Sequence, residues 1–168
     1  EWNDWLGKIE VEGGSREQQI KLYTDLWHAL LGRHVVSDAD GHYMDMTADF
    51  PRIRQIPLGD EGKPLYNHHN FDAWWGSHWS LDILWSMAYP EVMDDFCNTM
   101  IDMYRNGGLI PRGPSGGNYT YVMIGDPAAS FFASAYNKGI RNYDAELAYE
   151  GLRKNAFVGG IRDHAGYE

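Results

Sequence analysis

Cysteine is almost missing from this chain of 168 residues, because Cys97 is the only one. A single cysteine excludes an internal disulfide and a thiolate metal site, and Cys97 occurs within an apolar helical pattern. Long apolar runs are missing too. No stretch approaches the roughly 20 residues that a membrane-spanning helix needs, and the first residues lack the basic and apolar pattern of a signal peptide.

Basic residues are scarce as well. Lysine and arginine total 14 against 24 acidic residues, which gives a formal net charge of -10. Such a surface repels phosphate groups, so nucleic acid and anionic membranes are not expected as partners. A neutral or cationic ligand is accommodated more easily.

Aromatic residues, in contrast, are abundant at 14% of the chain, and they gather between Tyr66 and Asp82. Here Trp74, Trp75 and Trp79 alternate with histidines and aspartates. Flat aromatic faces beside such polar groups suit a sugar, because a ring stacks on the indole while the polar groups bind its hydroxyls. The candidate sugar contacts in this stretch are Asp72, Trp75, His78 and Trp79. The alternatives are core tryptophans, a structural histidine and a helix N-cap at Asp72.

Helix signals divide the chain. Ser15 and Gln18 form a capping box, which predicts a helix that ends at Gly32 in a left-handed conformation. Further helices are expected at 81–88, 90–104, 126–139 and 142–156, the second and third with Pro90 and Pro127 in the first turn. Helices 81–88 and 128–136 are apolar on nearly all sides. The helix at 90–104 has one polar face, with Glu91, Asp94, Asp95 and Asp102 expected in water.

Two long loops precede the apolar helices. The loop at 33–66 is rich in acidic residues, but Tyr43 stands where an EF-hand requires glycine, so a hydrogen-bonded turn at Asp38–Gly41 is expected instead of a calcium cage. The loop at 109–125 is rich in glycine yet lacks the Lys-Ser/Thr pair of a P-loop. Its Arg112 is expected to hold a loop carbonyl or to reach a ligand hydroxyl, and Asp126 is expected to cap a helix and to bind ligand.

The order of the helices is amphipathic, apolar, amphipathic, apolar, amphipathic. Two concentric layers produce this alternation, because only inner helices are covered on all sides. The expected fold is therefore all-α, an incomplete (α/α)6 toroid in which both long loops open on one face. Residues 1–168 are expected to be a fragment of one such domain, since neither end carries a closing segment.

Four motifs point to a family. Ser37-Asp-Ala-Asp-Gly-His-Tyr43, Gly108-Leu-Ile-Pro111, Met123-Ile-Gly-Asp126 and the segment Ala135–Asp144 together resemble glycoside hydrolase family 92, the calcium-dependent exo-acting α-mannosidases. The resemblance covers nearly the whole chain.

The resemblance implies an (α/α)6 toroid joined to a β-sandwich, and an inverting, calcium-assisted hydrolysis of terminal α-mannosides in glycans. It also implies a secreted or periplasmic enzyme. The general acid, the base and most calcium ligands of the family occur later in the chain, so they are expected beyond Glu168. No catalytic or metal-binding residue is therefore assigned within this chain.

The chain departs from the family at the tryptophan-rich stretch. A Trp-Asp-Thr-aromatic-Arg motif that contacts sugar in the family falls on Trp75–Trp79, where Gly76 replaces the aspartate and Trp79 the arginine. Either neighbouring Asp72 and His78 substitute for the lost groups, or a different sugar or linkage is bound. A non-catalytic helical carbohydrate-binding or scaffold fragment remains the alternative function.

Overall fold

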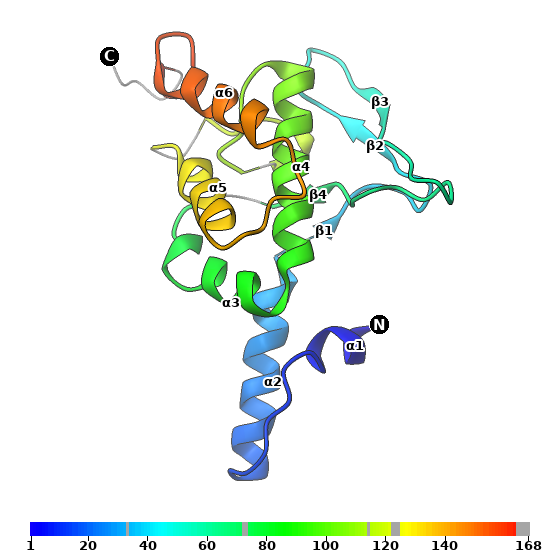
Figure 1. Cartoon of the computed structure of the whole chain (residues 1–168), viewed down its shortest axis with the longest axis vertical. Coiled ribbons are helices and arrows are strands. Elements are labelled where there is room, and N and C mark those ends of the chain that lie inside the picture. The colour runs from blue at the N-terminus through cyan, green and yellow to red at the C-terminus, as the bar shows by residue number, and fades with distance from the viewer. Residues whose placement is uncertain (33, 72–73, 114, 122–124, 164–168) are drawn as a thin grey trace. The chain divides into compact units, whose positions relative to one another are not determined.

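The computed structural model describes residues 1–32, 34–71, 74–113, 115–121 and 125–163 (Figure 1). The chain forms two compact units, Glu1–Arg33 and His34–Glu168.

The first unit consists of α1 (Trp2–Leu6) and α2 (Arg16–Leu31). The capping box is confirmed: the Gln18 amide donates to Ser15 Oγ at 3.3 Å, and the Ser15 amide donates to Gln18 Oε1 at 2.8 Å. The left-handed end at Gly32 is wrong, because its φ is -67°. Helix α1 was not predicted. Its Trp2 ring meets the Trp27 ring of α2 edge to face, with the centroids 6.2 Å apart.

The second unit contains four longer helices, α3 (Leu81–Ala88), α4 (Pro90–Gly107), α5 (Pro127–Asn137) and α6 (Ala145–Ala156), with short 3-10 turns at Ser77–Trp79 and Ser115–Gly117. The first-turn prolines Pro90 and Pro127 are confirmed. Helix α4 ends at Gly108, whose φ of +87° is a left-handed conformation that glycine adopts without strain. The start of α6 is fixed by Asp144, whose Oδ1 accepts from the Leu147 amide at 3.0 Å.

The expectation of an all-α fold is not confirmed, because the loop at 33–66 contains strands. β1 (His34–Val35) pairs antiparallel with β4 (His69–Asn70), and β2 (His42–Asp45) pairs antiparallel with β3 (Arg52–Gln55), so that Asp45 lies opposite Arg52. The predicted turn before β2 is confirmed. The Gly41 amide donates to the Asp38 carbonyl at 2.8 Å, and the Asp38 amide donates to the His42 carbonyl at 2.7 Å.

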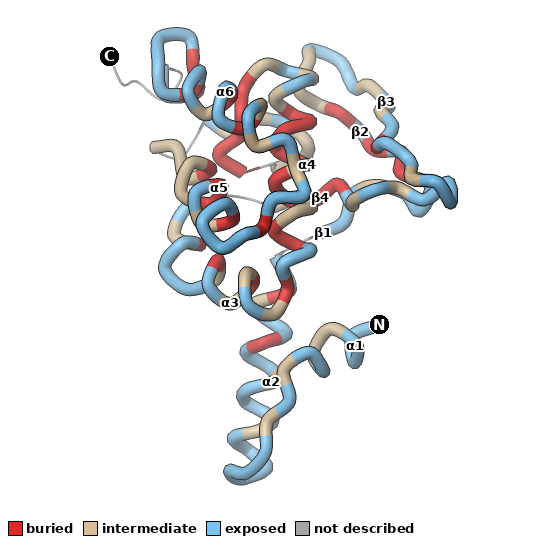
Figure 2. Tube along the Cα trace, viewed as in Figure 1, coloured by how far each residue is buried: buried red, intermediate tan, exposed pale blue. Residues whose placement is uncertain are grey.

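Helix α4 forms the centre of the second unit, where it packs against α3, α5, α6 and β4 (Figures 1 and 2). Its buried side chains include Met93, Phe96, Cys97, Met100 and Ile101. The expectation that Asp102 faces water is wrong: its side chain is buried, and the Tyr66 hydroxyl donates to it at 2.7 Å.

The predicted complete burial of α3 and α5 is also wrong for this chain. Met87 of α3 is 79% exposed and Tyr136 of α5 is 47% exposed. Both helices turn one apolar side to α4 and leave the other uncovered, so the alternation of covered and uncovered helices is not observed. Helix α6 has one buried side, formed by Ala148, Gly151 and Asn155. No described helix combines the length and the apolar character that a membrane crossing requires.

Candidate functional site

The first part of the tryptophan-rich stretch is anchored in the core. Trp74 is fully buried, its ring stacks on Phe131 of α5 at a centroid distance of 4.1 Å, and its indole N–H donates to Met100 Sδ at 3.0 Å. The Ser77 hydroxyl donates to the Trp74 carbonyl at 3.0 Å and thereby closes a turn. Trp74 thus holds the following residues against α4 and α5.

The next two tryptophans lie at the surface. Trp75 is 57% exposed and Trp79 is 66% exposed, and their rings meet edge to face with centroids 5.7 Å apart and an interplanar angle of 81°. The His78 ring lies beside Trp79 at 5.0 Å. Large aromatic side chains left in water are unusual, and such rings can stack on the apolar face of a sugar. The structure brings these three candidates together.

Gly76 makes this arrangement possible. Its φ of +82° is left-handed, and a Cβ at this position would lie 3.0 Å from the Trp79 ring. A side chain here would be strained by the backbone and would press on the indole. Gly76 therefore allows Trp79 to fold back over the turn.

Arg112 lies behind the exposed tryptophans. Its backbone carbonyl accepts from the Trp74 amide at 3.0 Å, and its fully buried guanidinium donates through Nη2 to the Ile161 carbonyl at 3.0 Å. Of the two roles expected for Arg112, holding a loop carbonyl is the one that these contacts show. Arg112 ties the tryptophan turn to the segment after α6.

Asp126 occupies the predicted N-cap position of α5, but its side chain makes no capping hydrogen bond. Its Oδ1 is buried and finds no hydrogen-bond partner among the described residues. Burial raises the pKa of this carboxyl, and the nearby Asn155, Arg162 and Arg112 counteract the rise. The carboxyl thus interacts with Asn155 and with the charges of the two arginines, and not with the α5 amides.

The two long loops contact each other. The Met46 amide donates to the Gly117 carbonyl at 3.2 Å, and the Gly116 amide donates to Asn70 Oδ1 at 2.5 Å. Gly117 has a φ of +71°, and a Cβ there would lie 3.1 Å from the Met44 carbonyl oxygen. The glycines of the second loop therefore serve the close approach of the two backbones.

The predicted sugar contact Asp72 lies outside the described residues, as do Met123 and Ile124 of the Met123–Asp126 motif. The adjacent histidines turn to different neighbours: the His68 ring stacks on Tyr43 at 4.0 Å, and His69 Nε2 lies 3.3 Å from an oxygen of Asp95.

The tryptophan-rich stretch ends in a buried carboxyl group, that of Asp82, which was not among the candidate site residues predicted from the sequence. Asp82, in the first turn of α3, is fully buried, and neither of its oxygens has a hydrogen-bond partner within the described part of the chain. Burial raises its pKa, while Ser77, Lys138 and His78 act in the opposite direction. The signal that could have found it is an aspartate inside an otherwise apolar helix.

Comparison with known proteins gives these features a context. Residues 1–167 match the profile of the glycosyl hydrolase family 92 catalytic domain. A search of curated protein sequences found no significant match.

Solved structures of the same family resemble the chain. A GH92 α-mannosidase from Bacteroides thetaiotaomicron superimposes on 90% of the chain with a TM-score of 0.78 and 25% identity. The same enzyme in complex with mannoimidazole gives a TM-score of 0.76 with 24% identity over 90% of the chain. A GH92 inverting mannosidase from this organism gives 0.70 with 24% identity over 92%.

The chain spans only 19% to 20% of the length of these solved proteins. The profile match nevertheless extends over almost every residue of the chain. The chain therefore belongs to glycosyl hydrolase family 92 and corresponds to part of the catalytic domain of that family.

Proposed function

We propose that this chain is part of a secreted or periplasmic enzyme that removes terminal α-linked mannose from glycans by inverting hydrolysis, and that it supplies part of the wall that holds the sugar. Family membership and the similarity to α-mannosidases, one of them solved with mannoimidazole, support the substrate class. The observation that carries the role of this chain is the exposed pair Trp75 and Trp79 beside His78.

In this proposal the indole faces of Trp75 and Trp79 orient the sugar ring, and His78 binds a hydroxyl. Arg112 acts indirectly, because its guanidinium holds the Ile161 carbonyl while its own carbonyl holds Trp74. Asp126 belongs to the same layer behind the wall, where it interacts with the charge of Arg112.

The chemical step needs other residues. Inverting hydrolysis requires a carboxylic acid and a carboxylate base about 6.5 to 9.5 Å apart, with a water between the base and the sugar. Among the described residues, the carboxyl groups of Asp45, Asp82 and Asp102 are enclosed by other parts of the chain, and the partly buried carboxyl of Asp126 interacts with Asn155, Arg162 and Arg112. We place the acid and the base in the remainder of the enzyme.

Calcium is implied by the family, so its fit to this chain matters. Among the described residues no group of three or more His, Cys, Asp or Glu side chains could hold a metal ion. Two acidic residues of the first long loop are already engaged, Asp40 with His42 and Asp45 with Arg52 and Arg54. The described side chains do not form a calcium site by themselves, and we place most ligands of that ion in the remainder of the enzyme.

Three neighbouring tryptophans provide a test within the complete enzyme. We expect Trp75→Ala and Trp79→Ala to lower kcat/KM for an α-mannoside by about tenfold, because apolar surface covered on an indole contributes roughly 25 cal/mol per Å², so that about 60 Å² corresponds to a factor of ten. The stability of the two variants should change little, because in the proposed wall both indoles stay open to the ligand, as they are exposed in this chain. Steady-state kinetics and urea unfolding measure the two effects.

Trp74→Ala is the matched control, because Trp74 is buried in the core. It should lower the free energy of unfolding by about 3–5 kcal/mol. If Trp75→Ala and Trp79→Ala lose stability as Trp74→Ala does, and keep normal kinetics in the folded fraction, the two exposed tryptophans are structural and the proposed wall is wrong.

A further inference from the structure

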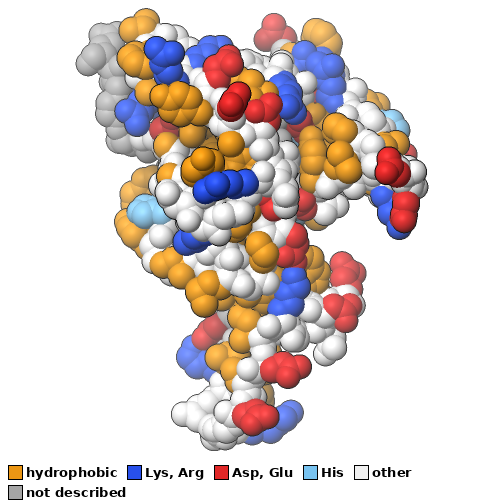
Figure 3. Space-filling model, viewed as in Figure 1, with side chains coloured by type: hydrophobic (Ala, Val, Ile, Leu, Met, Phe, Trp, Pro, Cys, Tyr) orange, Lys and Arg blue, Asp and Glu red, His pale blue; other side chains and the backbone are white. Residues whose placement is uncertain are grey.

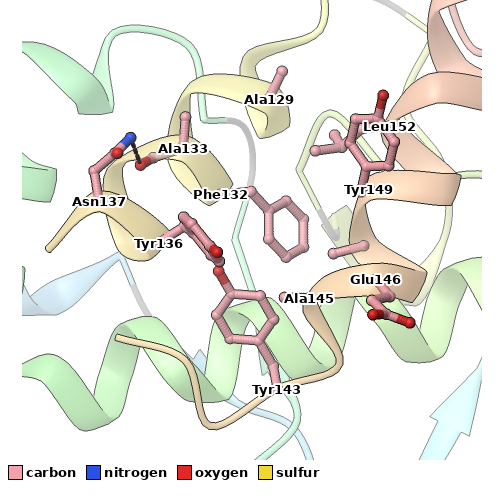
Figure 4. Close-up of a pocket in the computed structure, with 11 residues that line it drawn as sticks. Ala129, Phe132, Ala133, Tyr136, Asn137, Tyr143, Ala145, Glu146, Tyr149 and Leu152 are labelled. Atoms are coloured by element: carbon pink, nitrogen blue, oxygen red, sulfur yellow. Dashed lines mark hydrogen bonds between the residues drawn. The ribbon is translucent and has the colours of Figure 1, made fainter. Parts of the chain in front are cut away.

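The groove between α5 and α6, about 710 Å³ in volume, is a poor surface for a sugar (Figure 4). Hydrophobic side chains lie at the surface over these two helices (Figure 3). Among the described residues that line the groove, Glu146 carries the only charge, and the Asn137 amide already donates to the Ala133 carbonyl at 2.8 Å. Few polar groups are left for sugar hydroxyls. The exposed pair Trp75 and Trp79, which does not line this groove, is the better surface for a sugar.

The two exposed indoles lie in different planes. Their planes meet at 81°, and the ring centroids of Trp75 and Trp79 lie 5.7 Å apart. A pyranose ring that stacks flat on one indole therefore stands almost perpendicular to the other, and it can touch that second indole only with its edge. Trp75 is nevertheless 57% exposed and Trp79 is 66% exposed. The pair thus offers two stacking surfaces, and one sugar ring can stack on only one of them.

An α-linked mannose disaccharide has the matching shape. In the chair form of an α-mannoside, the bond from C1 to the linking oxygen is axial, so it leaves the ring roughly perpendicular to the mean plane of that ring. The second ring is thereby displaced from the plane of the first and inclined to it. A flat platform contacts one of the two rings, whereas two surfaces inclined at 81° can contact both.

The local backbone distinguishes the two positions. Trp75 directly follows Trp74, which is fully buried and whose amide donates to the Arg112 carbonyl at 3.0 Å. The sugar that reacts must be held accurately, so the terminal mannose belongs on the indole beside this anchor. Trp79 lies one turn further along the chain, where its amide donates to the Gly76 carbonyl at 3.3 Å. The second sugar therefore belongs on Trp79.

We propose that Trp75 and Trp79 bind two successive sugar rings, the terminal α-mannose on Trp75 and the sugar to which it is linked on Trp79. This inference rests on the proposed function and divides its sugar wall into two positions. The substrate class is then a glycan that ends in an α-linked disaccharide. His78, whose ring lies 5.0 Å from that of Trp79, binds a hydroxyl of the second sugar. The loss of activity expected from Trp79→Ala is thus confined to substrates with a second sugar.

Titration calorimetry of the complete enzyme with two kinds of ligand tests the proposal. Methyl α-thiomannoside carries one sugar ring, and a thio-linked α-mannobiose carries two. Sulfur in place of the linking oxygen makes both resistant to hydrolysis. The mannobiose is prepared with each linkage position in turn, and the one that the wild-type enzyme binds most tightly is used for the variants.

We expect Trp79→Ala to weaken binding of the disaccharide by about tenfold, because about 60 Å² of apolar surface covered on the indole corresponds to that factor. Binding of methyl α-thiomannoside should change by less than about twofold. Trp75→Ala should weaken the binding of both ligands by about tenfold. Trp79→Phe is the matched control, because it keeps a flat aromatic face, and its affinity for the disaccharide should stay within about threefold of the wild type.

Three results would overturn the proposal. Equal weakening of both ligands by Trp79→Ala would place both indoles against one ring. Unchanged binding of both ligands in this variant would remove Trp79 from the site. A wild-type enzyme that binds the disaccharide no better than the one-ring ligand would show that no second position exists. Urea unfolding of the variants at position 79 checks that their stability matches that of the wild type.

Hydrolysis is measured separately with the oxygen-linked disaccharide. An enzyme that binds the two ligands as expected but releases no mannose would keep the two positions and contradict the proposed activity. An enzyme that releases mannose, but in which Trp79→Ala weakens both ligands equally, would keep the activity and contradict the two positions.

Discussion

The carboxyl group of Asp102 shows how one buried residue links a loop to the central helix. The Tyr66 hydroxyl donates to Asp102 at 2.7 Å, and Arg105 Nη1 lies 3.5 Å from its other oxygen. Burial raises the pKa of Asp102 to about 6, although Tyr66 and Arg105 act in the opposite direction. The folded chain therefore binds this proton more tightly than the unfolded chain, so the stability that this group contributes is lost as the pH rises through about 6.

Tyr66→Phe should be most harmful above that pH. At pH 7 the buried carboxylate loses its donor, and we expect a loss of about 1.5–3 kcal/mol in the free energy of unfolding. At pH 5 the carboxyl is largely protonated, and the loss should fall to about 1 kcal/mol. Urea unfolding at the two pH values measures both.

Tyr104→Phe is the control, because its hydroxyl donates to Glu150 at 2.9 Å on the exposed surface. It should cost less than about 0.5 kcal/mol at either pH. A pH-independent effect of Tyr66→Phe would show that the hydroxyl does not stabilise the ionised form of Asp102.

Asp82 is also buried but, unlike Asp102, has no hydrogen-bond partner among the described residues. Its pKa is raised mainly by burial, so its favourable contribution exists at low pH and disappears as the pH rises through the folded-state pKa. We expect Asp82→Asn to increase the free energy of unfolding at pH 7 by about 1 kcal/mol, and the gain to vanish near pH 4. Asp60→Asn, on the exposed loop after β3, should change nothing at either pH. Destabilisation by Asp82→Asn at pH 7 would contradict this account.

At the scale of elements, capping signals predicted the helices and the strands were missed. Ser15, Pro90 and Pro127 mark helix starts whose chemistry is local, so the sequence alone was sufficient for them. The cap of α6 at Asp144 was not identified, and that helix was expected from residue 142. Strand β2 alternates between exposed and buried residues, yet one of its two buried positions holds Asp45. Hydrophobic alternation is therefore absent, because the buried position is filled by an ion pair formed with the partner strand.

Asp45 of β2 links the two strands of the β2–β3 hairpin, because it pairs with Arg52 of β3. Through Arg52 it also links the hairpin to the end of α4. Arg52 Nη2 lies 2.6 Å from Asp45 Oδ2 and also donates to the Asn106 carbonyl at 3.1 Å. The Thr47 hydroxyl donates to Asp45 Oδ1 at 2.6 Å. Burial alone would raise the pKa of Asp45, but these hydrogen bonds and the arginine charges lower it.

Asp45→Ala should therefore cost about 3–5 kcal/mol at pH 7, because it leaves a partly buried guanidinium without its carboxylate. Asp40→Ala, on the exposed turn before β2, should have a much smaller effect. Since the pKa of Asp45 is lowered, its contribution is present above the unfolded pKa and is lost on acidification. Chemical unfolding between pH 3 and 7 measures the difference between the two variants. Equal losses of stability in both would show that the ion pairs of Asp45 do not stabilise the hairpin.

At the scale of the whole molecule, sequence predicted the helical segments and the family but not which sides of the helices are covered. Helices α3 and α5 looked apolar on nearly all sides, and each leaves one such side uncovered, as Met87 and Tyr136 show. Burial depends on partners outside a helix, so a pattern along one segment cannot supply it. The same limit applies to the site. Trp75 and Trp79 were selected by their residue type, whereas the core role of Trp74 depends on Phe131 and Met100, which are distant in sequence.

The chain alone should have no catalytic activity. We expect the purified 168-residue protein to release no mannose from an α-mannoside, because the acid and the base are placed in the remainder of the enzyme. A sensitive assay of released mannose, with a mock purification as the control for contaminating enzymes, measures this. Turnover that follows the 168-residue protein through purification would show that the chain carries its own catalytic carboxylates.

The adjacency of a buried and an exposed tryptophan has a thermodynamic consequence for recognition. Trp74 is fixed by its ring contacts, its indole N–H and the Arg112 carbonyl, so the backbone that leads into Trp75 is ordered before any ligand arrives. Binding then pays little entropy for arranging the platform. A sugar that docks on these rings should therefore bind with a small, negative heat-capacity change from the covered indole faces, without the larger one that accompanies the folding of a loop.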